Sequence, residues 1–141
     1  MYRYIQKKYG DCLFIILGNG EQRKYLESYS ANKGIKNIVV FKGNRPPEEV
    51  ADYIGTSDGF LVGSYYEGFS VAMVEAFASC RPIVSTNVSG AKDLIIEGKN
   101  GFIVNNRNPT TYAEAIYNAL CLKSIIHVNA KLIEKYDERK M

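Results

Sequence analysis

A short apolar run at Gly59–Val62 leads through a glycine-containing turn into a helical pattern that begins at about Ser70. A strand, a tight turn and a helix form half of a βαβ unit, from which parallel sheets are built. Similar apolar runs recur at Cys12–Leu17, Ile38–Phe41, Pro82–Thr86 and Phe102–Val104. Near-continuous apolar runs are typical of parallel strands that helices cover on both faces. The sequence therefore predicts an α/β fold.

Helical patterns separate these runs. They cover Tyr2–Tyr9, Glu21–Lys33, Pro46–Ile54, Ala91–Glu97, a segment starting at Asn108–Thr110 and a last helix from about Ile125. In the helix after Ser70, one apolar stripe holds Val71, Val74 and Ala78, and Met73 and Phe77 lie beside it. We expect these residues to face the core, because apolar residues at helical spacing form a buried face.

The turn at Glu67, Gly68 and Phe69 leads into the N-terminus of the helix at Ser70. A helix N-terminus has unpaired backbone N–H groups and the positive end of the helix dipole, so it suits a phosphate group. The Ser70 hydroxyl can cap this terminus or turn toward a ligand. Gly68 lets the backbone come close to a bulky anion. The pattern predicts a phosphate site.

Two glutamates flank this phosphate site. Glu75 lies eight positions after Glu67, about two helical turns along. Both carboxylates can point toward the crevice at the carboxyl edge of the sheet, where open α/β folds bind ligands. Because carboxylates accept hydrogen bonds from sugar hydroxyls, the pattern indicates a nucleotide sugar. The alternative for Glu75 is a solvated surface residue.

The block Glu67–Glu75, with Ala76, Ala78, Pro82, Ile83 and Val84 after it, resembles the E-x7-E signature of retaining glycosyltransferases of the GT-B fold, family 4 (glycosyl transferases group 1). Further matches fall in the family's order at Gly18-Asn19-Gly20, Phe41-Lys42-Gly43, Ser57-Asp58, Ser64, Gly90 and Asn100-Gly101-Phe102. The resemblance extends from about Tyr2 to Tyr136. It implies that residues 1–141 are the C-terminal, donor-binding half of such an enzyme, a Rossmann-like doubly wound parallel sheet.

The resemblance also implies roles for single residues. Glu75 would hydrogen-bond the ribose, and the backbone N–H groups of Gly68, Phe69 and Ser70 would hold the distal phosphate. Glu67, the candidate catalytic residue, would contact the donor sugar beside the scissile bond. We assign no nucleophile and expect no bound metal and no cofactor, because oriented N–H groups and cations can stabilise the leaving diphosphate.

Two loops after the first and second strands complete the candidate site. Gly18 and Gly20 would line the ligand cleft, and the alternative for them is a plain strand-to-helix turn. Asn44 and Arg45 lie in the loop that borders the nucleotide base in the resembling family. The alternative for Lys42 and Arg45 is solvated surface charge.

Two of the departures from the family bear on the fold. Cys80 stands where the family usually has a glycine at the end of a helix, and a left-handed backbone there would be strained by a side chain. The first strand of the donor-binding half has no counterpart, so five strands are visible where six are expected. In the strand order 3-2-1-4-5-6 the missing strand is central. We therefore expect a fragment, or a subunit that needs a partner carrying the acceptor-binding domain.

Composition restricts the class of partner. The net charge of +3 is small and dispersed, which argues against nucleic acid. Cys12, Cys80 and Cys121 lack metal-ligand spacing and indicate reduced thiols in the cytoplasm. No apolar run reaches the length of a membrane span, which leaves peripheral contact with the inner face of the membrane open. His127, the single histidine, is expected to be structural or exposed.

The expected activity is transfer of a sugar, with retention, from a nucleoside-diphosphate sugar to an acceptor sugar or lipid-linked sugar, in polysaccharide or glycolipid assembly. Three alternatives stay open: a non-catalytic donor-binding subunit, a sugar-nucleotide epimerase and an inactive remnant. The base, the sugar and the acceptor are not readable from the sequence.

Overall fold

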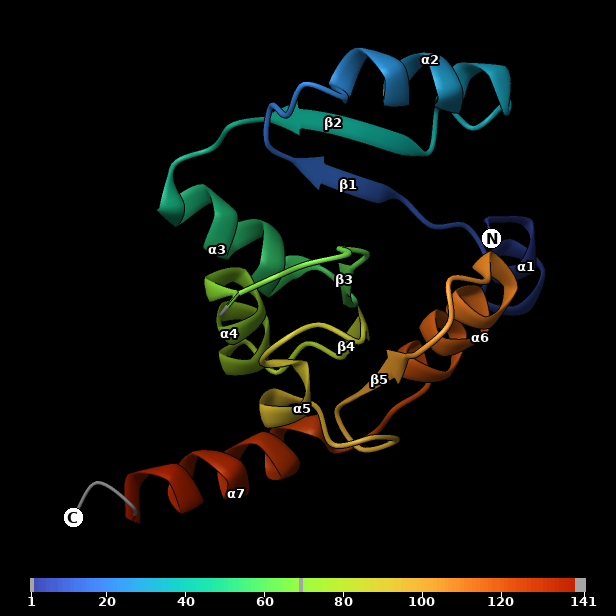
Figure 1. The fold of residues 1–141 in the computed structure, drawn as a ribbon. Coiled ribbons are helices and arrows are strands. Elements are labelled where there is room, and N and C mark those ends of the chain that lie inside the picture. Colours follow the sequence, from blue (N-terminus) through green and yellow to red (C-terminus); the bar gives the residue numbers. More distant parts are fainter. Residues whose placement is uncertain (1, 69, 139–141) are drawn as a thin grey trace.

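The computed structural model describes residues 2–68 and 70–138, and shows alternating strands and helices (Figure 1). The strands are β1 (Phe14–Leu17), β2 (Val39–Gly43), β3 (Phe60–Val62), β4 (Ile83–Thr86) and β5 (Gly101–Val104). The helices are α1 (Tyr2–Tyr9), α2 (Arg23–Asn32), α3 (Pro47–Thr56), α4 (Val71–Ala78), α5 (Ala91–Leu94), α6 (Pro109–Leu120) and α7 (Ile125–Glu138). None of these described helices is long and apolar enough to cross a membrane. The expected α/β fold is confirmed.

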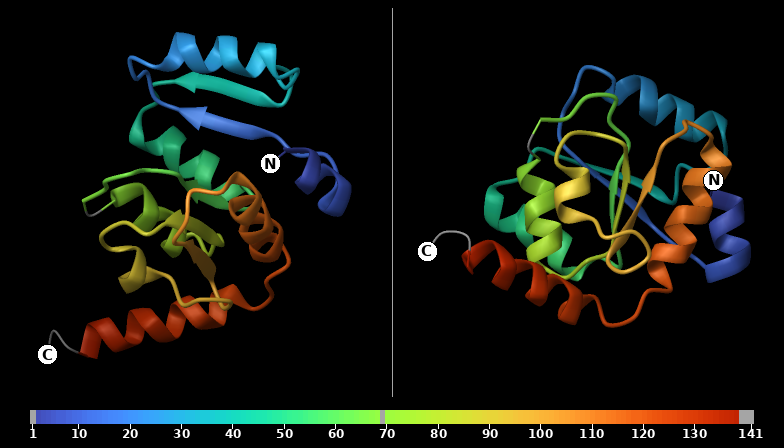
Figure 2. Two further views of the ribbon diagram at one scale, coloured as in Figure 1. Left: turned by 45° about the vertical axis from the view of Figure 1, so that its right-hand side comes forward. Right: turned by 60° about the horizontal axis from the view of Figure 1, so that its bottom comes forward.

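The strands form two parallel sheets. One contains β1 and β2, and the other has the order β3-β4-β5. Within the described residues β1 and β3 do not pair, and the left view in Figure 2 sets the β1–β2 pair apart from the other three strands. In the order 3-2-1-4-5-6, removal of the central strand 1 separates strands 3-2 from strands 4-5-6. These two groups correspond to β2–β1 and β3–β4–β5, so the expected interruption of the sheet lies between β1 and β3.

The β3–β4–β5 sheet has helices on both faces. Ile83 of β4 packs in a cluster with Met73 and Phe77 of α4, whereas the next residue, Val84, packs with Ile5 of α1 and Ile116 of α6. Successive side chains of a strand point to opposite faces. The core therefore consists of two layers of apolar side chains, one on each side of β4.

The β1–β2 pair is much more open than the sequence indicates. We expected a strand covered on both faces, but Ile15 is 45% exposed and Ile16 is 37% exposed. Figure 1 shows α2 along this pair and the remaining helices grouped around the other sheet. The prediction of a fully buried β1 is wrong, because within the described residues β1 pairs with β2 alone and the sheet is interrupted on its other side.

The buried face of helix α4 agrees only in part with the expected one. Met73, Ala76 and Phe77 are buried, which confirms the expectation for Met73 and Phe77. Val71 is 67% exposed and Ala78 is also exposed, so the expectation for these two residues is wrong. The stripe with the two largest apolar side chains faces the sheet, and Val71, the first helical residue, lies at the edge of the contact.

Buried amides connect α7 to the rest of the molecule. The side-chain amide of Asn100 donates to Asn129 Oδ1 at 2.8 Å, and that of Asn129 donates to the Phe77 carbonyl at 2.7 Å. These bonds satisfy polar groups that would be costly to bury alone.

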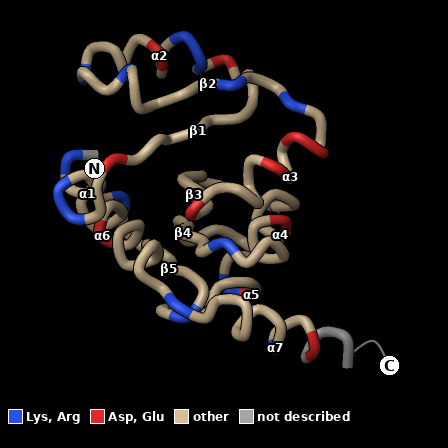
Figure 3. The backbone as a smooth tube through the Cα atoms, turned by 180° about the vertical axis from the view of Figure 1, so that it is seen from behind, with Lys and Arg blue, Asp and Glu red and all other residues tan. Residues whose placement is uncertain are grey.

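The charged residues of two helices differ in sign: α1 carries basic residues and α3 carries acidic ones (Figure 3). His127 is exposed on α7, as expected.

Helix α4 ends at a left-handed residue that has a side chain. Cys80 has a φ of 54°, its N–H donates to the Phe77 carbonyl at 3.1 Å, and the next N–H, of Arg81, donates to the Ala76 carbonyl at 2.9 Å. These two bonds form a Schellman motif, in which glycine is the preferred left-handed residue. The strain expected from Cys80 at this position is therefore present.

We expect Cys80→Gly to raise the free energy of unfolding by about 1 kcal/mol, because it removes the left-handed strain while adding some entropy to the unfolded chain. Urea denaturation measures the change. Cys80→Ala is the matched control, since it removes the thiol and keeps the Cβ atom. Equal stabilities of the Gly and Ala variants would contradict the strain.

The interrupted sheet predicts a pattern of amide hydrogen exchange. The N–H of Phe14 donates to the Ile38 carbonyl at 2.8 Å, and that of Phe60 donates to the Pro82 carbonyl at 2.9 Å. Because strand N–H groups alternate in direction, those of Ile15 and Leu61 face away from the partner strands. We expect the Ile15 and Leu61 amides to exchange faster than those of Phe14 and Phe60. Equal protection would mean that the gap is filled.

Candidate functional site

The N-terminus of α4 lies just beyond the carboxyl end of β3. Ser70 has an extended backbone, and its hydroxyl accepts a hydrogen bond from the Met73 N–H at 3.3 Å, as expected of a cap. The Ser70 carbonyl accepts from the Met73 and Val74 N–H groups. Helical geometry leaves the N–H groups of Val71 and Ala72 without an intrahelical acceptor. This end of α4 therefore presents donors to an anion.

Glu67 is held close to this helix end by the loop after β3. The Ser64 hydroxyl donates to Glu67 Oε2 at 2.7 Å. The Ser64 carbonyl in turn accepts from the Thr86 hydroxyl at 2.7 Å, which connects the loop to the end of β4. Glu67 is half-buried. A carboxylate has two oxygens, so one remains for a ligand hydroxyl.

Tyr112 of α6 fixes the strand ends from which these loops leave. Its hydroxyl lies 2.9 Å from the carbonyl oxygens of both Val62 and Val84, the first at the end of β3 and the second within β4. Burial raises the pKa of Tyr112 well above the usual value for tyrosine. The hydroxyl is therefore protonated and able to donate at neutral pH.

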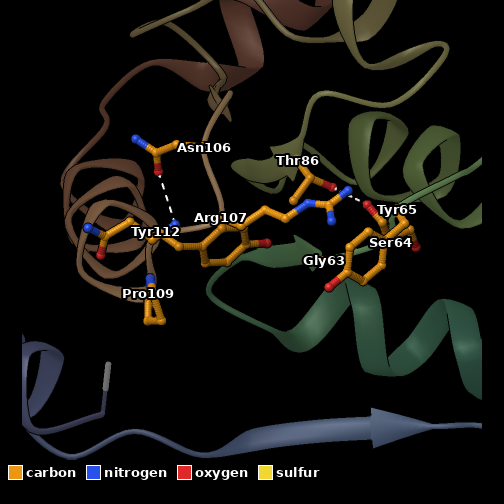
Figure 4. A pocket seen from close by; sticks show the side chains of 9 residues that line it. Gly63, Ser64, Tyr65, Thr86, Asn106, Arg107, Pro109 and Tyr112 are labelled. Carbon is orange, nitrogen blue, oxygen red and sulfur yellow. Dashed lines mark hydrogen bonds between the residues drawn. The ribbon is translucent and has the colours of Figure 1, made fainter.

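A cavity of about 270 Å³ opens beside the Ser64–Glu67 contact (Figure 4). Its walls come from the loops after β3 and β5, the last residue of β4 and the start of α6; they are Gly63, Ser64, Tyr65, Thr86, Asn106, Arg107, Asn108, Pro109 and Tyr112. The guanidinium carbon of Arg107 lies 3.6 Å from the centre of the Tyr65 ring. None of Tyr65, Thr86, Arg107 and Tyr112 was predicted from the sequence as a site residue. The available signal was the position of Arg107 in a loop after a strand, at the same edge of the sheet as Ser64.

The loops after β1 and β2 lie against each other. The Gly18 N–H donates to the Gly43 carbonyl at 2.8 Å, and both glycines have positive φ, 111° and 72°. Arg23 extends between the loops, with its guanidinium bonded to Asn19 Oδ1 and 3.4 Å from the Phe41 carbonyl. The positive φ of Gly18 supports a structural need for glycine there in addition to any ligand role.

Arg45 makes its contacts with residues close to it in the sequence. Its Nε donates to the Lys42 carbonyl at 3.0 Å, and its guanidinium lies 3.4 Å from the carboxylate of Glu49, the acidic residue one turn along. Both Arg45 and Asn44 are exposed. Within the described residues, no hydrogen bond or ion pair joins these two loops to the loop of Glu67. The structure thus gathers the candidate residues into two groups, one on each side of the gap between the sheets.

The remaining candidate residues differ in what surrounds them. Glu75 lies in the second turn of α4 and is partly buried. Gly20 and Gly68 have no left-handed φ, and a Cβ atom added to either would meet no other atom within 4 Å. The space around both is therefore open to a ligand. Phe69 lies outside the described residues. Among the residues described, no group of three or more His, Cys, Asp or Glu can hold a metal ion.

The chain is similar in sequence to known glycosyltransferases. Residues 1–137 match the sequence model of a family described as Glycosyl transferases group 1. The chain is 34% identical over 100 residues to the D-inositol 3-phosphate glycosyltransferase of Corynebacterium urealyticum, a match that covers 70% of this chain and 24% of that protein. The chain therefore spans about a quarter of the length of this relative.

Solved structures share the fold. TarM superposes with a TM-score of 0.79 at 25% identity, over 96% of this chain and 28% of that one. The C-terminal domain of a glycosyl transferase group 1 family protein from Francisella tularensis, LpcC, superposes with a TM-score of 0.71 at 19% identity. That match covers 95% of this chain and 75% of the other. The interrupted sheet thus corresponds to a Rossmann-like half of a GT-B glycosyltransferase.

The role of the Tyr112 hydroxyl can be tested by Tyr112→Phe. We expect a loss of about 1–3 kcal/mol in the free energy of unfolding, because the carbonyls of Val62 and Val84 lose the hydroxyl proton that they share. The loss is present below about pH 10 and shrinks above it, since the tyrosine of the unfolded chain then ionises while the folded pKa is higher. Urea denaturation at several pH values measures both effects.

Tyr66→Phe is the matched control, because Tyr66 is 96% exposed. If Tyr112→Phe is as stable as Tyr66→Phe at neutral pH, the hydroxyl does not hold the two strands together.

Proposed function

Because the chain belongs to the glycosyl transferases group 1 family, we propose that it is the donor-binding domain of a glycosyltransferase. The family gives the broad activity, transfer of a sugar. The finer proposal is that residues 1–141 form the C-terminal half of a retaining, family 4 enzyme that uses a nucleoside-diphosphate sugar. The observation that carries it is the Ser70-capped end of α4 with the Glu67 carboxylate held near it.

The diphosphate would lie at the N-terminus of α4. The N–H groups of Val71 and Ala72 are free of intrahelical acceptors, and the dipole of an eight-residue helix favours negative charge at this end. Negative charge grows on the diphosphate as the sugar leaves, so donors oriented in advance stabilise the transition state more than the ground state. The open space at Gly68 supports close approach of the phosphate to the backbone.

Glu67 would receive a hydroxyl of the donor sugar. Its bond to Ser64 orients one carboxylate oxygen and leaves the other for the ligand. Since Ser64 is itself bonded to Thr86, the carboxylate is positioned by two strands and pays little ordering cost on binding. Glu75, farther along α4, would bind the ribose hydroxyls.

Gly18, Gly20, Asn44 and Arg45 would complete the site on the nucleotide side. They lie beyond the gap between the two sheets, so the distance from this group to α4 depends on what fills that gap. The acceptor, a sugar or a lipid-linked sugar in polysaccharide or glycolipid assembly, would be bound by a separate domain or subunit. We propose a cytoplasmic location with peripheral contact to the membrane, which fits an acceptor attached to a lipid.

Thermal unfolding with a panel of UDP, GDP, ADP, dTDP and CDP tests the donor site. A ligand at about one hundred times its dissociation constant should add about 2.7 kcal/mol and raise the unfolding midpoint by several degrees. We expect one diphosphate to do so and Glu75→Ala to abolish the shift.

Glu134→Ala is the control, because Glu134 is an exposed helical glutamate on α7. The donor-site proposal is wrong if no diphosphate shifts the midpoint, or if Glu75→Ala responds as Glu134→Ala does.

A further inference from the structure

The cavity next to Ser64 is separate from the diphosphate position at α4. It lies between the loops that follow β3 and β5 and the end of β4, and Figure 4 shows Arg107 extending across it from the α6 side toward Tyr65 and Ser64. Pockets for drug-sized ligands start at about 300 Å³. With a volume of about 270 Å³, this cavity has room for a single sugar ring and is too small for a nucleotide sugar.

The walls have the character of a sugar subsite. Tyr65 is 69% exposed, yet its ring is held by the guanidinium of Arg107 stacked on it at 3.6 Å. Such stacking is attractive and limits the rotation of an otherwise free ring. Tyr65, Pro109 and Tyr112 supply apolar surface, whereas Asn106 and Arg107 supply donors. Apolar walls with a few placed polar groups are typical of small-molecule sites.

The cavity is lined by positive charge and by no negative charge. Arg107 is the single charged residue among those that line it. Within the described residues, the guanidinium of Arg107 makes no hydrogen bond or ion pair, so its N–H groups are available to a ligand. Glu67, the carboxylate in the same loop as Ser64 and Tyr65, is bonded to Ser64. Arginine binds carboxylate and phosphate through two parallel hydrogen bonds, so the cavity favours an oxyanion.

We propose that this cavity binds an acidic sugar, with the ring against Tyr65 and the phosphate or carboxylate on Arg107. Its use as a subsite that adds to acceptor binding by the separate domain rests on the proposed function, whereas the binding itself does not. The position suits an acceptor, because the cavity adjoins the loop that carries Glu67, where the donor sugar would lie. Phosphate and carboxylate share the recognition chemistry, and separate ligands distinguish them.

Titration of the isotope-labelled chain, followed by amide NMR, tests the proposal with D-glucose 6-phosphate, D-glucuronate, D-glucose and inorganic phosphate. We expect at least one of the two acidic sugars to bind tenfold or more tightly than glucose, with shifts at Tyr65, Thr86 and Asn106. The better acidic sugar identifies the anion. We also expect it to bind more tightly than inorganic phosphate, because only the sugar contacts the Tyr65 ring.

Two substitutions separate the charge from the ring. Arg107→Gln should weaken binding of the acidic sugar about tenfold or more, as expected for loss of a charge-assisted hydrogen bond. Arg3→Gln, at an exposed residue of α1, is the matched control and should bind as the unmodified chain does. Tyr65→Ala should also weaken binding, and Tyr65→Phe should retain it because the ring remains.

Several results would overturn the proposal. The chain could bind glucose as tightly as both acidic sugars, or inorganic phosphate as tightly as the acidic sugars. Arg107→Gln could bind the acidic sugar as the unmodified chain does. A chain that is folded by its amide spectrum could also bind none of these ligands. The nucleotide melts keep the two proposals apart. If a diphosphate stabilises the chain and no acidic sugar binds, the donor site stands and the subsite is wrong; the reverse result leaves the subsite and removes the donor site.

Discussion

The hydroxyl of Tyr112 is the contact on which the site depends most. Its single proton lies within reach of carbonyl oxygens of both β3 and β4, those of Val62 and Val84. Carbonyls at buried strand ends are costly without a donor, and here α6 provides it from 50 residues away along the chain from Val62. The loop that carries Glu67 begins just beyond Val62, and Thr86, which holds that loop through Ser64, is the last residue of β4. Their geometry is therefore set by packing of α6 on the sheet.

The molecule has a closed part and an open part. The β3–β4–β5 sheet is covered on both faces and carries the end of α4, Glu67 and the cavity of Arg107. The β1–β2 pair has exposed aliphatic side chains and carries the loops of Gly18 and Arg45. The part that would bind the reacting sugar and phosphate is thus already ordered by its own core. The part that would border the base depends on whatever pairs with β1 and β3.

Local features could be predicted from the sequence because they depend on neighbouring residues. The cap at Ser70, the bounds of α1 and the strain at Cys80 follow from residue type and short-range spacing. The exposure of β1 could not be predicted from its own apolar run, because burial depends on what packs against the strand. The bond from Tyr112 to Val62 and the Arg107–Tyr65 stack were missed for a similar reason. Each joins segments more than 40 residues apart, and no local pattern marks such a contact.

The central claim is that the end of α4 binds the diphosphate of a nucleotide donor. A crystal structure of the chain with the nucleoside diphosphate that binds most tightly tests it directly. The account predicts phosphate oxygens about 3 Å from the N–H groups at the start of α4, with the ribose at Glu75. A diphosphate at the Gly18–Gly20 loop or on Arg107, with the end of α4 free of phosphate, would contradict it.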